Sequence, residues 1–246
     1  MEKTVASIDD LKIKIFADGA DLEGIRSLYA NPLIKGFTTN PTLMRKAGIS
    51  DYHKFAREVL EVVQDRPVSF EVFADDFDEM ETQAHEIASW GPNVNVKIPV
   101  TNTKGEFAGD LIRRLSNSGV AVNVTAIMTL DQVERVVDCL NEDTSAIVSV
   151  FAGRIADTGR DPIYIMKQSV NALSRKPLAE LIWASPRELL NIFHAESTGC
   201  HIITITGDVL NKLNIIGKNL DEYSLDTVKM FYTDASSAGY SIKTSV

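Results

Sequence analysis

Short runs of β-forming residues alternate with amphipathic helical segments along almost the whole chain, and this alternation constrains the fold more than any other feature of the sequence. Eight such runs begin at residues 14, 34, 68, 94, 120, 146, 181 and 201. Segments with apolar residues at three- and four-residue intervals follow nearly every run, for example from Tyr52, Phe77 and Leu130. Parallel strands need such helical crossovers. Eight strand–helix units in 246 residues therefore predict an α/β fold, a single (β/α)8 or TIM barrel.

Helix-capping spacings support these boundaries. Thr129 with Gln132, and Ser185 with Glu188, have the spacing of a capping box. Pro186 falls at the first position of the helix that Ser185 would cap, which is the position that proline prefers. The sequence therefore predicts helices that begin directly after residues 129 and 185.

The chain has no linker rich in Gly, Pro or Ser, so we expect one domain over residues 1–246. Residues 1–12 form a polar lead-in ahead of the first strand. Residues 220–246 carry an amphipathic pattern that ends in a loose polar tail, which predicts an extra C-terminal helix after the barrel.

Composition excludes several classes of protein. The 25 basic and 34 acidic residues give a net charge of −9, which argues against a nucleic-acid partner. The two cysteines lack a CxxC spacing and the four histidines are scattered, so we expect neither disulfides nor a metal site. Acidic residues stand where a signal peptide would be apolar, and no run approaches about 18 apolar residues. We therefore expect a cytoplasmic protein with no membrane partner.

Polar residues recur on one side of the predicted strands. Strand side chains alternate between the barrel interior and the surrounding helices. When the large aliphatic residues are assigned to the helix side, seven strands carry polar residues on the other side. These are Asp18, Asn40, Glu71, Asn95, Lys97, Asn123, Thr125, Ser149 and Ser185. Branched apolar side chains normally fill a barrel, so these polar residues, mostly near the carboxyl ends of the strands, predict an active site there.

Lys97 is the most informative of these residues, because it lies between Val96 and Ile98 in an apolar strand. An ammonium is costly there unless it has a partner or a chemical task. Apolar surroundings favour the neutral, nucleophilic amine, which is what a Schiff-base lysine requires. A structural salt bridge to Asp18 or Glu71 accounts for the position equally well. Those two carboxylates form a candidate acid/base pair, or they only compensate the charge of Lys97.

Three residues could bind an anion. A helix capped by Ser185 would present its N-terminus to a phosphate, and Arg187 nearby would add a planar guanidinium donor. Arg154, just after the sixth strand, is a second such donor. Capping alone also explains Ser185, and either arginine is explained as a surface charge.

The motifs around these residues resemble the transaldolase family of class I aldolases, in its small, compact branch. They are FADGA, GFTTNPTL, SFEVF, VKIPVT, NVTAI, SVFAGRIAD and ASPRE. They follow one another in family order on seven strands, and the resemblance covers residues 13–213. One departure is Gly207, where the family often has proline.

The resemblance implies roles for four catalytic residues. Lys97 resembles the lysine that attacks the ketose carbonyl to form a Schiff base. Asp18 resembles the base that takes the proton of the hydroxyl beyond the scissile bond. Glu71 and Thr125 resemble the pair that holds a water and moves protons as the imine forms. Because the iminium is itself the electron sink, the resemblance implies no cofactor and no metal.

The resemblance also implies a binding site for sugar phosphates. Asn40, Asn123 and Ser149 resemble the groups that bind the hydroxyls of the dihydroxyacetone fragment. Arg154, Ser185 and Arg187 resemble the groups that bind the phosphate. A homo-oligomer is implied as well, since small family members form rings.

The implied reaction is transfer of a dihydroxyacetone unit from sedoheptulose 7-phosphate or fructose 6-phosphate to glyceraldehyde 3-phosphate or erythrose 4-phosphate, as in the pentose phosphate pathway. An alternative is a fructose-6-phosphate aldolase that releases free dihydroxyacetone. That branch of the family has tyrosine where this chain has Phe151 and glutamine where it has Glu71, which favours the transferase. A barrel that binds sugar phosphates without catalysis is the alternative from another class.

Overall fold

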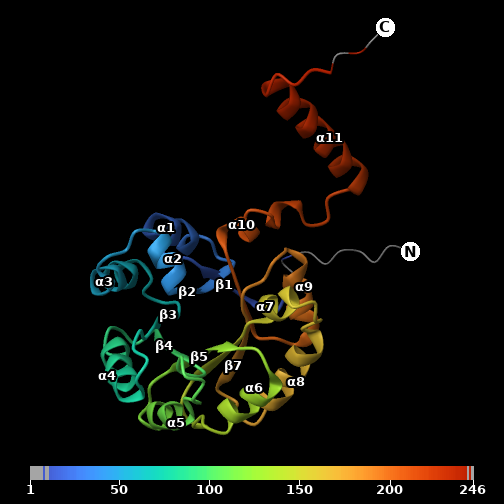
Figure 1. The fold of residues 1–246 in the computed structure, drawn as a ribbon. Helices are drawn as coiled ribbons and strands as arrows, with labels where there is room; N and C mark the ends of the chain where they lie inside the picture. Colours follow the sequence, from blue (N-terminus) through green and yellow to red (C-terminus); the bar gives the residue numbers. More distant parts are fainter. Residues whose placement is uncertain (1–7, 9–10, 243, 245–246) are drawn as a thin grey trace. The chain divides into compact units, whose positions relative to one another are not determined.

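Eight parallel strands close into a barrel in the computed structural model, which describes residue 8, residues 11–242 and residue 244 (Figure 1). Each strand pairs with the next along the chain, and β8 pairs with β1. The strands are β1 (Lys14–Asp18), β2 (Ile34–Thr38), β3 (Val68–Glu71), β4 (Val94–Pro99), β5 (Val122–Ile127), β6 (Ala146–Val150), β7 (Ala179–Trp183) and β8 (Ile202–Ile205). The predicted (β/α)8 barrel is confirmed.

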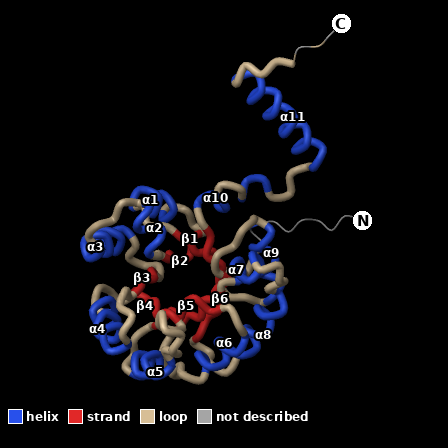
Figure 2. The backbone as a smooth tube through the Cα atoms, viewed as in Figure 1, coloured by secondary structure: helices blue, strands red, loops and turns tan. Residues whose placement is uncertain are grey.

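Helices surround these strands, as the blue segments outside the red ring show (Figure 2). They bury apolar residues, and those that begin at Tyr52, Phe77 and Leu130 were predicted from the spacing of these residues. They are α1 (Leu22–Tyr29), α2 (Pro41–Lys46), α3 (Tyr52–Val62), α4 (Phe77–Ala88), α5 (Gly109–Asn117), α6 (Leu130–Val137), α7 (Ala152–Asp157), α8 (Ile163–Leu173), α9 (Leu190–Thr198) and α10 (Gly207–Leu210). Thr129 and Gln132 form the predicted capping box of α6.

The predicted helix start at Pro186 is wrong, because α9 begins at Leu190 and Ser185 does not cap it. Ser185 has φ 57°, in the left-handed region, whereas an N-cap residue is extended. The packing of Gly153 on this turn explains the difference, since a Cβ on Gly153 would lie 1.5 Å from the Ser185 carbonyl oxygen. Asn191, inside α9, accepts hydrogen bonds from the amides of Arg187 and Glu188, which are the amides that a capping Ser185 side chain was expected to satisfy.

The chain separates into two compact units, residues 12–211 with the barrel and residues 1–11 together with 212–246. The second unit contains a short 3-10 helix, η2 (Leu213–Ile215), and the predicted C-terminal helix, α11 (Leu220–Ser237). Most of the lead-in expected over residues 1–12 lies outside the described residues, and one domain over residues 1–246 stays a prediction. Within the described part of the chain, no helix is long and apolar enough to cross a lipid bilayer.

An apolar cluster lies inside the barrel on the side of β1, β6, β7 and β8. It consists of the buried side chains of Phe16, Ile147, Ile182, Ala184 and Ile202, with Phe151 packed against it. Gly36 on β2 is required here, because a Cβ at this position would lie 2.5 Å from the Phe16 ring. We call this cluster the apolar layer; it lies between two cavities, one at each end of the strands.

Candidate active site

A cavity of about 420 Å³ opens at the carboxyl ends of the strands. Ten of the eleven predicted site residues line it. They are Asp18, Asn40, Glu71, Lys97, Asn123, Thr125, Ser149, Phe151, Arg154 and Ser185. The alternation of the strands brings together residues from six of the eight strand–helix units at one end of the barrel. On the seventh strand the predicted parity is wrong, because Ile182 and Ala184 face the interior. Ser185 reaches the cavity through its left-handed backbone conformation instead.

The buried amine of Lys97 lies between two oxygen acceptors. Its Nζ donates to the Thr39 carbonyl at 2.7 Å and lies 3.1 Å from Oε2 of Glu71. The register of β3 against β4 places Glu71 directly beside Lys97. Only 7% of Lys97 is exposed to solvent, so the charge is held by these neighbours rather than by water. The ion pair foreseen as one explanation of Lys97 exists, and it points into the cavity.

Asp18 ends β1 and accepts two hydrogen bonds. Thr38 Oγ1 donates to Oδ1 at 2.8 Å, and Asn40 Nδ2 donates to Oδ2 at 3.3 Å. Burial raises the pKa of Asp18, and the charge of Lys97 together with the two hydrogen bonds opposes this rise. The Asn40 side chain also caps α2, since its Oδ1 accepts from the Leu43 amide at 2.9 Å. The helix cap thereby orients the amide that faces Asp18.

Thr204 on β8 is a cavity residue that the sequence reasoning missed. Its Oγ1 lies 2.6 Å from Oγ1 of Thr38, so it belongs to the network that holds Asp18. The available signal was the alternation on the eighth strand, where Thr204 stands between Ile203 and Ile205. The same inner position that carries polar residues on the other strands therefore carries one here.

A second buried network spans three strands. Ser149 Oγ donates to Oδ1 of Asn123 at 2.7 Å, and Asn123 Nδ2 donates to Ser69 Oγ at 3.0 Å. Asn123 and Ser69 are fully buried. Because both ends of the Asn123 amide have a partner, its orientation is fixed before any substrate arrives.

Thr125 carries a buried hydroxyl that has no hydrogen-bond partner among the described residues. A buried polar group without a partner costs about 1–3 kcal/mol. The next residue, Ala126, has φ 63° at a bulge where the β5–β6 register shifts, and a left-handed alanine costs about 1–2 kcal/mol. A left-handed residue and a buried hydroxyl with no protein partner among the described residues therefore lie next to each other in the cavity wall.

The two predicted phosphate-binding arginines differ in position. Arg154 lines the cavity from α7, lies over the Phe151 ring at 5.4 Å, and has no acidic residue within ion-pair distance among the described residues. Arg187 does not line the cavity. It instead forms an ion pair with Asp157, because the carboxylate matches the planar guanidinium with two parallel hydrogen bonds.

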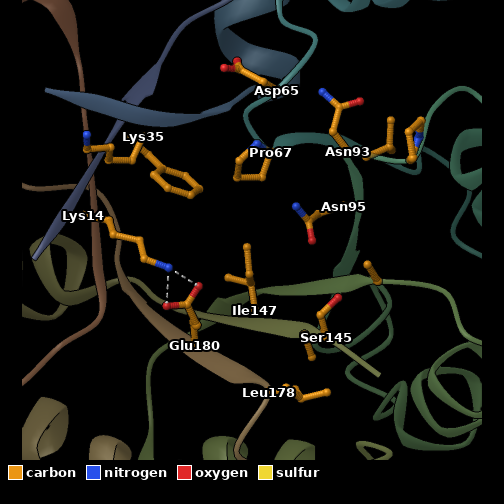
Figure 3. A pocket seen from close by; sticks show the side chains of 15 residues that line it. Lys14, Lys35, Asp65, Pro67, Asn93, Asn95, Ser145, Ile147, Leu178 and Glu180 are labelled. Atoms are coloured by element: carbon orange, nitrogen blue, oxygen red, sulfur yellow. Dashed lines mark hydrogen bonds and ion pairs between the residues drawn. The ribbon is translucent and has the colours of Figure 1, made fainter. Parts of the chain in front are cut away.

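Asn95 lies at the other end of the barrel from the predicted site. It precedes Lys97 by two residues on the same side of β4, so it points inward about 6–7 Å nearer the amino end. There it lines a second cavity, of about 530 Å³ (Figure 3). The Lys14 ammonium on one wall of this cavity pairs with Glu180 at 2.8 Å. The apolar layer separates these residues from Lys97.

No group of three or more His, Cys, Asp or Glu side chains in the described ranges is arranged to hold a metal ion. What the cavity at the carboxyl ends offers is an amine beside a carboxylate, a second carboxylate held by hydroxyl and amide donors, and a cation on α7. Such an arrangement can form a covalent adduct with a carbonyl and move protons on either side of it.

Comparison with known proteins adds evidence from the sequence. Residues 15–243 match the family model described as transaldolase/fructose-6-phosphate aldolase. A protein of Dehalococcoides mccartyi named "Probable transaldolase" is 36% identical over 202 residues, which cover 82% of this chain and 90% of that protein. One of Methanococcus maripaludis with the same name is 35% identical over 82% of this chain and 89% of its own length. A solved structure of an aldolase designated QR15 shares the fold, with a TM-score of 0.55 over 84% of this chain and 99% of that chain, at 12% identity. The chain is therefore an enzyme of the transaldolase/fructose-6-phosphate aldolase family.

Proposed function

We propose that the enzyme is a transaldolase, which transfers a dihydroxyacetone unit from a ketose phosphate to an aldose phosphate through a Schiff base on Lys97. One observation carries the proposal: the Lys97 amine is buried, lies 3.1 Å from Glu71, and shares a cavity with Asp18 and Thr125. A barrel that only binds sugar phosphates has no need for this costly amine at the binding surface.

In the first half of the reaction, Glu71 takes a proton from Lys97 and the neutral amine attacks the ketose carbonyl. The carbinolamine then loses water, with Glu71 as the proton donor and the Thr125 hydroxyl as the group that holds the departing water. The unpartnered state of the Thr125 hydroxyl supports this role, since a water there would satisfy it. The product is an iminium that draws electrons from the neighbouring carbon–carbon bond.

In the second half, ionised Asp18 takes the proton of the hydroxyl on the carbon beyond that bond. The bond breaks, its electron pair moves into the iminium to form an enamine, and an aldose leaves. The raised pKa of Asp18 makes this carboxylate a stronger base than an exposed one. The same group returns the proton when the enamine adds to an acceptor aldehyde, which forms the iminium of the new ketose on Lys97. Water then hydrolyses this iminium and releases the ketose and the Lys97 amine.

The remaining cavity residues bind the substrate in this proposal. Asn40, Asn123 and Ser149 hold the hydroxyls of the dihydroxyacetone unit, and the preset Asn123 amide limits how that unit can lie. Arg154 and Ser185 bind the phosphate. Arg187 joins them only after it leaves Asp157, a movement that two hydrogen bonds oppose.

A fructose-6-phosphate aldolase is the second candidate, because the family description names both activities. That activity requires a proton on the enamine carbon before the imine is hydrolysed. Phe151 lines the cavity, and its ring packs on the apolar layer, so it offers neither a proton nor an anchor for a water. We therefore favour transfer over release.

A donor–acceptor assay tests the proposal. With fructose 6-phosphate alone, the enzyme should release little dihydroxyacetone, and added erythrose 4-phosphate should give rapid production of sedoheptulose 7-phosphate. Fast release of dihydroxyacetone without an acceptor would establish the aldolase instead, and no turnover under either condition would establish a binding protein.

The proposal extends to assembly and location. The described residues of α11 bury none of their side chains, and Tyr223, Val228, Phe231 and Tyr232 are largely exposed on that helix. An exposed apolar helix favours a homo-oligomer in which this surface is covered. The two cysteines are buried and unpaired, as is usual for proteins of a reducing compartment, and this supports a cytoplasmic location.

A further inference from the structure

Hydrogen bonding between β2 and β3 departs from the regular parallel pattern beside Lys97. Phe37 pairs with Val68, and Thr38 pairs with Ser69. The Thr39 amide continues this ladder by donating to the Ser69 carbonyl at 3.2 Å. In a regular parallel ladder, the carbonyl of that same residue accepts the amide two positions further along the partner strand. Here that amide belongs to Glu71.

The expected bond between the Glu71 amide and the Thr39 carbonyl is replaced by two others. The Thr39 carbonyl accepts the Lys97 ammonium at 2.7 Å. The Glu71 amide donates to the hydroxyl of Tyr52 at 2.8 Å, and that hydroxyl donates to the Glu71 carbonyl at 3.1 Å. Tyr52 is the first residue of α3, which lies outside the barrel near β2 and β3 (Figure 1). One side chain thus satisfies both main-chain groups of Glu71.

The Tyr52 ring is held by aromatic neighbours that do not involve its hydroxyl. Its centroid lies 4.6 Å from that of Phe73, 5.5 Å from that of Trp90 and 6.1 Å from that of Phe70. Such contacts hold a ring in place. Burial raises the pKa of Tyr52 above its usual range, so the hydroxyl keeps the proton that it donates to Glu71. The position of the hydroxyl is therefore set by the ring and persists at any working pH.

We propose that Tyr52 is a positioning residue for Lys97. Its hydroxyl takes the place of Thr39 as the partner of the Glu71 amide, and this leaves the Thr39 carbonyl free to bind the lysine amine. The inference rests on the proposed function to the extent that Lys97 is the nucleophile. Tyr52 does not contact the substrate; it acts through Thr39 and Glu71.

This exchange of hydrogen-bond partners explains why the Thr39 carbonyl oxygen and the Glu71 carboxylate both face the Lys97 amine. Without the hydroxyl, the Glu71 amide is a buried donor in need of an acceptor, and the Thr39 carbonyl is the acceptor that the regular ladder supplies. A bond between them competes with Lys97 for this carbonyl and turns its oxygen toward the β2–β3 ladder. The amine then keeps only the Glu71 carboxylate, and its direction of attack is no longer fixed.

Tyr52→Phe tests the proposal, because it removes the hydroxyl and keeps the ring. We expect kcat for dihydroxyacetone transfer to fall by about tenfold or more while KM changes by less than about twofold, since alignment and not substrate binding is lost. Phe73→Leu is the matched control, because it removes one half-exposed aromatic neighbour of Tyr52 while Phe70 and Trp90 still hold the ring and its hydroxyl. It should match Tyr52→Phe in thermal stability and retain most of kcat.

A second measurement does not depend on the proposed reaction. Trace acetylation with acetic anhydride, read by mass spectrometry, reports the reactivity of Lys97 in each variant. Loss of the Thr39 carbonyl removes one of the two acceptors that hold the Lys97 amine in place, so Lys97 in Tyr52→Phe should acetylate faster than in the wild type although turnover is slower. A uniform structural loosening would instead speed acetylation in Phe73→Leu as well.

The outcomes separate the two proposals. If fructose 6-phosphate forms no adduct on Lys97 of the wild type, the proposed function is wrong, and acetylation still decides the role of Tyr52. If Lys97 is the nucleophile but Tyr52→Phe keeps wild-type kcat and acetylation, the role of Tyr52 is wrong. Equal losses of kcat in Tyr52→Phe and Phe73→Leu would also overturn it.

Discussion

Arg187 and Asp157 face one another in a two-pronged ion pair, with Nε 3.0 Å from Oδ1 and Nη2 2.5 Å from Oδ2. This pair keeps Arg187 away from the cavity that Arg154 lines. Both side chains of the pair are about half exposed, so solvent screens the attraction between them. Another anion can therefore replace Asp157 as the partner of Arg187. The phosphate of a bound substrate is such an anion.

The two arginines should therefore contribute differently to phosphate binding. Arg154→Ala should weaken the binding of phosphorylated substrates by about 1.5–3 kcal/mol, which is the range for a lost charge-assisted hydrogen bond. Arg187→Ala should cost less, because the wild-type arginine must first leave Asp157. Asp157→Asn should lower KM for fructose 6-phosphate by releasing Arg187. Comparison of kcat/KM for phosphorylated and unphosphorylated ketoses measures each effect, and equal losses on both substrates would indicate a folding defect.

Lys97 should be the residue that carries the covalent intermediate. Borohydride reduction with fructose 6-phosphate present should add a stable dihydroxyacetone-derived mass to the peptide that contains Lys97. Lys97→Ala should abolish both the adduct and turnover, because no other described lysine lines this cavity. Peptide mass spectrometry of the reduced enzyme identifies the residue, and a label on any other lysine would contradict the assignment.

The pH dependence should report Asp18. Burial raises the pKa of this carboxyl, and cleavage needs its ionised form, so the acid limb of kcat/KM should lie above the usual range of an aspartate. Replacement of Asp18 by Asn should remove cleavage while the Lys97 imine still forms. Stopped assays of cleavage over a pH series, beside borohydride trapping, separate the two steps.

The raised pKa of Asp18 also affects the stability of the folded protein. A carboxyl whose pKa is higher in the folded than in the unfolded state contributes stability that is complete below its unfolded pKa and is lost as the pH rises through the folded value. Asp18→Asn should therefore gain thermal stability relative to the wild type as the pH rises from about 4 to about 7. A Tm difference that is constant over this range would show that ionisation of Asp18 is not the cause.

Phe151 should decide between transfer and release. Phe151→Tyr adds a hydroxyl at the cavity wall that can hold a water near the enamine, so acceptor-independent release of dihydroxyacetone should rise severalfold. Coupled detection of dihydroxyacetone, with and without erythrose 4-phosphate, measures the ratio of the two activities. An unchanged ratio would mean that another group controls protonation of the enamine.

The strands and most of the cavity lining could be predicted because both follow from local alternation. Once the chain is a parallel barrel, the inner positions of all strands converge, and Asp18, Glu71 and Lys97 must meet whatever their separation in the sequence. The β3–β4 register then brings Glu71 beside Lys97. The local signals were polar residues at alternate strand positions and, most clearly, the charge of Lys97 in an apolar strand.

The features that escaped prediction depend on contacts between distant segments. Ser185 has the spacing of a helix cap, yet the close approach of Gly153 places it in a left-handed turn. The attachment of Arg187 to Asp157 and of Tyr52 to Glu71 also joins different strand–helix units. A capping box or a charge is visible in a short window, but the partner that overrides it is not.

The cavity that holds Lys97 and the cavity at the amino ends of the strands share no lining residue, and the apolar layer around Phe16 lies between them. The five core members of this layer are at least 95% buried, as in the packed interior that a (β/α)8 barrel normally has. For the proposed transfer, such a packed interior means that the first product departs at the carboxyl ends of the strands, where the acceptor also arrives. We therefore expect the two aldoses to compete for the same cavity and the kinetics to be ping-pong. The order of the steps then follows from the packing of the barrel interior as well as from the catalytic residues.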